Sequence, residues 1–126
     1  MEIRHTSVNP LTAGGATSGV SSWSVPTTIS PRVDIIDTGD AVVYLMDLAG
    51  VDSDRLFLEI SPKEVAVTGQ LSGKIPQGAL LYGERSRGAY ARVLALPRDL
   101  DSEHATADMN NGLLMVRFPK NNNRTT

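Results

Sequence analysis

The side chains with the most catalytic potential lie together in residues 99–104, where three carboxylates, the Ser102 hydroxyl and the His104 imidazole follow one another. A hydrolase needs such groups to converge, with a base that activates a nucleophile. Contiguous loop residues rarely converge, and the other histidine, His5, lies far away in the sequence. Neither histidine has a second ligand at metal-binding spacing. We therefore expect no catalytic residue, no metal site and no enzymatic activity.

Phosphate-binding groups are equally sparse. Arg85 and Arg87 could hold a phosphate, but Glu84 stands beside them, which favours a solvated role or a role at a dimer contact. Gly14 and Gly15 follow no strand-like run and do not form a Walker-type loop. The chain has no cysteine, which excludes disulfides, thiolate nucleophiles and cysteine-ligated metals. No cofactor is expected.

Composition and charge indicate a single domain and disfavour nucleic acid and membranes as partners. The chain has 126 residues, 40% of them hydrophobic and 21% charged, which fits one domain with some additional chain. Its formal net charge of −2 gives no electrostatic footprint for nucleic acid or for an anionic membrane. The first residues are followed by Ser, Thr and Gly rather than by an apolar run, so we expect neither a signal peptide nor a membrane span. A cytoplasmic location is the expectation.

The hydrophobic pattern between residues 32 and 120 has a period of two. Residues 41–48 and 56–60 alternate, and residues 65–68 follow a short turn as a partner strand. A second hairpin closes at Asn111 and Gly112, because both residues tolerate the positive φ angles of a type I′ turn. No window of a dozen residues has helical spacing with caps. Many short strands without crossover helices predict an all-β, antiparallel sandwich.

The two ends lack this pattern. Residues 1–31 are rich in Ser, Thr, Gly and Pro and almost uncharged, so they are interpreted as a flexible N-terminal arm. Residues 121–126 contain no apolar side chain and form a short polar stub. The expected organisation is thus an arm (1–31), a sandwich domain (32–120) and a stub (121–126). Four apolar residues of the arm either fold back onto the core or stay exposed on a tether: Val20, Trp23, Val25 and Ile29.

Residues 70–88 form a long excursion that fits a compact sandwich poorly. Long excursions in compact domains usually have a function or are disordered. If Leu80, Leu81 and Tyr82 form a strand held away from the sandwich, that strand needs a partner edge. A second copy of the chain can supply it.

The order of segments resembles the α-crystallin domain of small heat shock proteins, the Hsp20 family, over residues 32–120. The segments that carry the resemblance are Pro31–Ile35, Leu48–Val51, Glu84–Arg92, Leu96–Pro97 and Ala107–Leu114. The resemblance implies an immunoglobulin-like antiparallel sandwich. It also implies a homodimer that exchanges the strand within residues 79–86, and ATP-independent binding of unfolded client proteins.

The resemblance also implies roles for particular residues. The dimer-interface residues are Leu80, Leu81, Tyr82, Glu84, Arg85 and Arg92. The strand pattern leaves two interpretations of Arg92: it is a partly buried cation with an acidic partner, or its face of the strand is open to solvent at that point. An acidic partner would be Glu84 or an aspartate across the interface. A groove that would take an Ile-x-Ile tail is lined by Leu56, Leu58, Ile60 and Met109, although these side chains could equally be plain core. The client-binding residues are those of the arm.

This chain departs from the family pattern at its end. No Ile-x-Ile or Val-x-Val follows Lys120, so we expect a dimer or a small assembly, with the groove empty or filled by an arm segment such as Val25 or Ile29. Two other functions remain open. One is a p23/CS-like adaptor that binds a single folded partner, and the other is an assembly partner for longer small heat shock proteins. The strand-exchange segment within residues 79–92 favours the holdase chaperone over the adaptor.

Overall fold

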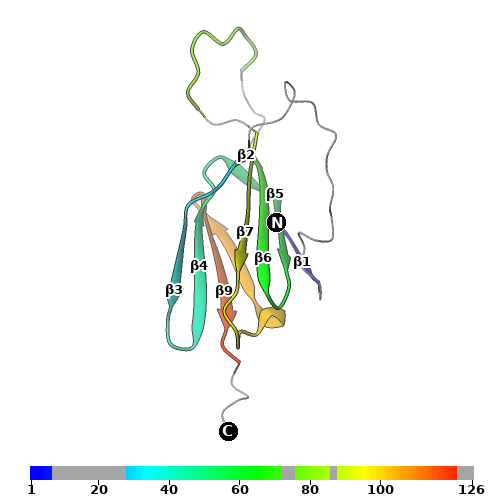
Figure 1. Cartoon of the computed structure of the whole chain (residues 1–126). Coiled ribbons are helices and arrows are strands. Elements are labelled where there is room, and N and C mark those ends of the chain that lie inside the picture. Colours follow the sequence, from blue (N-terminus) through cyan, green and yellow to red (C-terminus); the bar gives the residue numbers. More distant parts are fainter. Residues whose placement is uncertain (7–27, 72–75, 86–87, 122–126) are drawn as a thin grey trace.

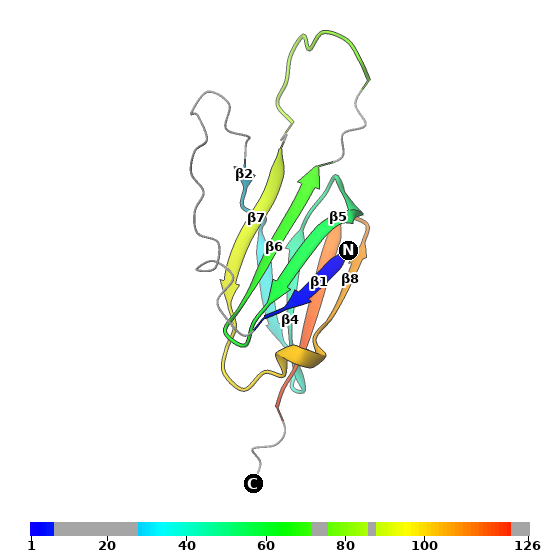
Figure 2. The same cartoon turned by 90° about the vertical axis from the view of Figure 1, so that its right-hand side faces the viewer.

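Two β-sheets pack face to face in the computed structural model, which describes residues 1–6, 28–71, 76–85 and 88–121 (Figures 1 and 2). One sheet has the strand order β1-β5-β6-β7-β2, and the other has the order β3-β4-β9-β8. The strands of the first sheet are β1 (Glu2–His5), β5 (Val51–Ile60), β6 (Glu64–Leu71), β7 (Ala89–Ala95) and β2 (Thr28–Ile29). Those of the second are β3 (Val33–Asp37), β4 (Ala41–Asp47), β9 (Leu113–Pro119) and β8 (Thr106–Asn110). The predicted sandwich is confirmed.

The alternating residues meet between the sheets. Tyr44 and Phe118 are both fully buried, with ring centroids 5.4 Å apart in an edge-to-face arrangement. The Tyr44 hydroxyl donates a hydrogen bond of 2.7 Å to the carbonyl of Ala95, which joins β4 in one sheet to β7 in the other. Burial raises the pKa of Tyr44 because water cannot solvate its phenolate there. This residue therefore fixes the spacing of the two sheets.

The Asn-Gly turn joins β8 to β9 as predicted. Asn111 and Gly112 have φ angles of 55° and 80°, and the Gly112 carbonyl accepts a 2.7 Å hydrogen bond from the amide of Leu48. A Cβ on Gly112 would lie 3.2 Å from the Cα of Ala49. Glycine is required here both for its backbone conformation and for the close approach of a second turn.

The structure departs from the sequence prediction at the N-terminal end, where two short strands occur within residues 1–31. β1 pairs in parallel with β5, and β2 pairs in parallel with β7, so they form opposite edges of one sheet. Strands of four and two residues carry no readable alternation of their own, because their hydrogen-bond partners lie far away in the sequence.

Residues 76–85 form no strand within this single chain. Figures 1 and 2 show the segment projecting beyond the end of the sandwich, away from both sheets. The strand expected within residues 79–86 is therefore absent from the isolated chain, and the segment does not fold back onto its own sheet. A strand needs a neighbouring edge to satisfy its backbone groups, and no such edge lies beside the segment here.

Candidate interaction surfaces

The projecting segment exposes large apolar side chains. Leu80, Leu81 and Tyr82 are 67%, 94% and 77% exposed. Tyr82 donates a 2.6 Å hydrogen bond to a carboxylate oxygen of Glu84, and this bond raises the pKa of the Tyr82 hydroxyl. Arg85 is also exposed. These predicted interface residues thus form one exposed group, whose apolar members contact little of their own chain.

β3 forms an unpaired edge of the four-stranded sheet. It pairs with β4 on one side and ends its sheet on the other. Ile35 lies on this edge and is 51% exposed, although it points toward the inner side of the sandwich, like its partner Tyr44. Exposed edges with apolar side chains are templates for pairing with another chain.

Arg92 lies on the inner face of β7 and is half-buried. Its Nη1 atom donates a 2.8 Å hydrogen bond to the carbonyl oxygen of Pro31, which is fully buried directly before β3. Within the described part of the chain, Arg92 forms no ion pair with Glu84 or with any aspartate. The cation therefore has a backbone partner in its own chain, and it ties β7 to the segment that leads into β3.

The predicted groove residues belong to the core. Leu56, Leu58 and Ile60 of β5 are fully buried, and Met109 of β8 packs against the same cluster. The strand that lies along the β5 edge is β1, an occupant that the sequence did not indicate. Of the two expected occupants, Ile29 lies on the opposite edge beside Tyr90, and Val25 falls outside the described residues.

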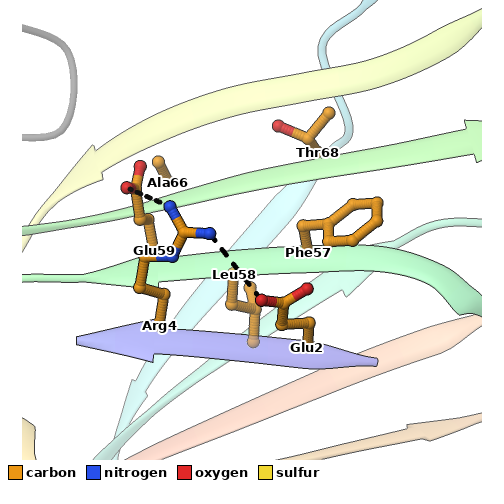
Figure 3. Close-up of a pocket in the computed structure, with 7 residues that line it drawn as sticks. All are labelled: Glu2, Arg4, Phe57, Leu58, Glu59, Ala66 and Thr68. Atoms are coloured by element: carbon orange, nitrogen blue, oxygen red, sulfur yellow. Dashed lines mark ion pairs between the residues drawn. The ribbon is translucent and has the colours of Figure 1, made fainter. Parts of the chain in front are cut away.

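β1 is held by backbone pairing and by exposed polar contacts. Figure 3 shows Arg4 between two carboxylates, at 3.8 Å from Glu2 and 3.9 Å from Glu59 of β5. These three residues and Phe57 border a shallow hollow of about 170 Å³ on the outer side of the sheet. At the other end of the strand, a ring nitrogen of His5 lies 3.1 Å from the carbonyl oxygen of Ser102. The ion pairs of Arg4 with Glu2 and Glu59 are exposed, and exposed ion pairs add little stability.

The acidic loop at residues 99–104, whose residue types could suggest a hydrolase, holds its histidine against a neighbouring aspartate. It contains a 3₁₀ turn, η2 (Ser102–His104), and the Nδ1 atom of His104 lies 2.8 Å from a carboxylate oxygen of Asp101. Across residues 1–6, 28–71, 76–85 and 88–121, no group of three or more His, Cys, Asp or Glu side chains could hold a metal ion. In the same ranges, no helix has the length and apolar character needed to cross a membrane.

Three of the predicted client-binding residues lie outside the described residues: Val20, Trp23 and Val25. Ile29, the fourth, is half-buried in β2. The structure therefore describes the interface residues and the groove residues but only one of the four predicted client-binding residues.

Comparisons with known proteins agree on one family. A sequence profile described as Hsp20/alpha crystallin family matches residues 34–126. A probable 15 kDa heat shock protein of Leptospira interrogans is 30% identical over 92 residues, which make up 73% of this chain and 71% of that protein. Small heat shock protein C4 of Rickettsia felis is 30% identical over 108 residues, or 80% of this chain and 66% of that relative. The solved structure of HSP18.5 from E. histolytica superposes with a TM-score of 0.68 at 25% identity, covering 77% of this chain and 93% of that one.

Proposed function

Because this chain belongs to the Hsp20/alpha crystallin family, we propose that it is an ATP-independent holdase, a chaperone that binds partly unfolded proteins and limits their aggregation. The observation that carries this proposal is the family match over residues 34–126. The apolar residues of the N-terminal arm support it, since a holdase needs apolar groups that are accessible to clients. Binding to the unfolded state competes with aggregation by mass action, and no nucleotide is required.

The proposal includes a homodimer formed by strand exchange. The segment within residues 79–86 of one protomer would pair with the β3 edge of its partner, and one of the two consecutive leucines, Leu80 or Leu81, would lie on the same side of the sheet as Ile35. Three features support this: the segment forms no strand in its own chain, its apolar side chains are exposed, and the β3 edge is unpaired. Pairing would satisfy both sets of backbone groups and bury both sets of apolar side chains.

The polar interface residues have supporting roles in this proposal. Glu84 and Arg85 lie at the end of the exchanged segment, where they can pair across the interface. Arg92 holds Pro31, and through it the start of β3, in the position that the partner's segment would contact. Arg92 is thus a positioning residue for the edge rather than a contact residue.

Clients would bind to apolar groups that can contact many different partners. We assign this role to the arm residues Val20, Trp23, Val25 and Ile29. The proposal places the protein in the cytoplasm and gives it no enzymatic activity. The absence of cysteine is consistent with a reducing compartment.

The holdase proposal is tested by heating an aggregating enzyme, unrelated in sequence, with and without the full chain at near-stoichiometric ratio and without nucleotide. Light scattering by the client should fall strongly in the presence of the chain and stay high with an inert protein of equal mass. Unhindered precipitation of several different clients, together with stable co-purification of one folded partner, would instead identify an adaptor.

The assembly is tested by measuring solution mass. The proposed assembly is a dimer or a small number of dimers. Multi-angle light scattering that shows a discrete particle of many subunits would refute this part of the proposal. Recruitment into larger particles only on mixing with a longer small heat shock protein would identify the chain as an assembly partner.

A further inference from the structure

The outer side of the four-stranded sheet carries a group of apolar side chains, three of them exposed, here called the outer apolar face. Side chains alternate between the two sides of each strand, and the register places one set of apolar residues side by side on the side away from the core. These residues are Ile36, Val43, Leu45, Leu113 and Met115. Ile36, Leu113 and Met115 are 42%, 36% and 43% exposed. A surface of this kind marks an interaction site more often than an isolated apolar side chain does.

Carboxylates close both ends of the central row of this face. The register runs from Asp34 on β3 through Leu45 and Met115 to Asp108 on β8. The two aspartates lie three inter-strand spacings apart, or about 14 Å. Neither of them forms an ion pair with a residue that the structure describes.

Two cations lie near the face, and one of them has an acidic partner. Arg117 lies in the next row and pairs with Asp40 at 3.4 Å. Arg32 precedes β3 and lies opposite Asp47, whose amide donates a hydrogen bond to the Arg32 carbonyl. Two carboxylates, Asp34 and Asp108, therefore stand at the ends of the central row, and Asp47 adds an exposed carboxylate in the row of Leu113.

We propose that the outer apolar face binds client segments in which apolar side chains are flanked by lysine or arginine. The inference rests on the holdase proposal and specifies the class of client. Charge complementarity argues for this occupant, since the apolar middle of the row lies between two carboxylates that a basic segment would neutralise. Met115 at the centre suits varied partners, because an unbranched thioether adapts to different shapes.

A second copy of the same face fits less well. Aligning the apolar side chains of two such faces would bring aspartates against aspartates, and like charges in an interface oppose association. Residues 7–27 of this chain contain no charged residue, so they would leave both carboxylates without a partner. A basic, apolar segment is the occupant that satisfies both features of the face.

The test compares two fluorescein-labelled, unstructured peptides with identical apolar residues, one with lysine and one with glutamate at the same flanking positions. Fluorescence anisotropy should show about fivefold tighter binding of the lysine peptide to the full-length wild type, as expected from two exposed ion pairs. This preference should shrink to within about twofold in the double variant Asp34→Asn/Asp108→Asn and also at high salt. The double variant Asp52→Asn/Asp54→Asn makes the same charge change on exposed positions of β5 and should keep the preference.

A further variant tests the apolar part of the surface. Met115→Ser should weaken the binding of both peptides by about threefold, consistent with the loss of a partly exposed apolar side chain. Equal affinities of the wild type for the two peptides, or a lysine preference that survives Asp34→Asn/Asp108→Asn, would overturn the inference. If the wild type suppresses client aggregation while the peptides bind equally, the inference fails and the holdase proposal stands. If the wild type does not suppress aggregation but prefers the lysine peptide in a way that depends on Asp34 and Asp108, the holdase proposal fails and the binding preference of the face stands.

Discussion

Replacing Arg92 tests whether its partner is a backbone carbonyl or a carboxylate. In the structure the guanidinium donates one 2.8 Å hydrogen bond to the Pro31 carbonyl, and Pro31 is fully buried. Hydrogen bonds to charged groups contribute about 1.5–3 kcal/mol, and losing one here leaves the Pro31 carbonyl without its partner. Because Arg92 is only half-buried, we expect Arg92→Ala to lower the free energy of unfolding by about 2 kcal/mol.

Urea unfolding followed by far-ultraviolet circular dichroism measures this change. With an m value of about 2 kcal/mol/M for a small domain, the expected loss shifts the midpoint by about 1 M. Arg55→Ala is the matched control, since Arg55 is exposed on β5 and should change stability by less than about 0.5 kcal/mol. A loss of about 3–5 kcal/mol for Arg92→Ala would contradict the reasoning, because that is the cost of leaving a buried carboxylate unpaired. A loss no larger than that of Arg55→Ala would show that the hydrogen bond from Arg92 to Pro31 does not contribute to stability.

Three further substitutions test the frame that positions the surfaces. Tyr44→Phe should lower the free energy of unfolding by about 1 kcal/mol, because the hydrogen bond from Tyr44 to β7 is lost while the ring stays packed. The thermal unfolding midpoint measures this loss. An unchanged midpoint would show that the hydrogen bond does not stabilise the sandwich. Gly112→Ala should lower the free energy of unfolding by about 1–3 kcal/mol, because alanine is strained at a positive φ and its Cβ would contact the Cα of Ala49. Urea unfolding measures this change. An unchanged stability would show that the turn relaxes to accommodate the side chain. Lys120 donates a hydrogen bond to Asp37 and holds the pKa of that carboxyl below 3.8, so its contribution exists above that pH and disappears as the carboxyl protonates below it. Lys120→Met should therefore destabilise the protein at pH 7 and lose its effect as the pH falls through the lowered pKa of Asp37; an effect that does not change with pH would contradict the linkage.

The core of the fold could be predicted because its signals are local. The alternation in residues 41–48 and the Asn111–Gly112 turn fix which side chains face inward and where the chain reverses, and the structure confirms both. The alternation around Arg92 left open whether this residue is a partly buried cation with an acidic partner or lies on an open face, and the structure shows it half-buried on the inner face of β7. Its acceptor is a carbonyl far away in the sequence, and no local pattern could identify it.

The surfaces were less accessible to sequence reasoning. β1 lies along β5 through a parallel register between residues more than fifty positions apart, and the four residues of β1 have no distinctive pattern. The residues predicted to line a groove, Leu56, Leu58 and Ile60, have the same apolar alternation whether they line a groove or fill a core. The outer apolar face depends on the register of four strands at once, which composition and periodicity do not specify.

Strand exchange between protomers is tested most directly by hydrogen–deuterium exchange of the backbone amides in residues 79–85 and in β3, measured over a range of protein concentrations. The amides of an unpaired segment exchange freely, and those of a paired strand are protected. The account predicts that both segments are protected together at high concentration and lose protection together on dilution, in step with the change from dimer to monomer mass. Free exchange of residues 79–85 in a particle whose measured mass is that of a dimer would contradict it.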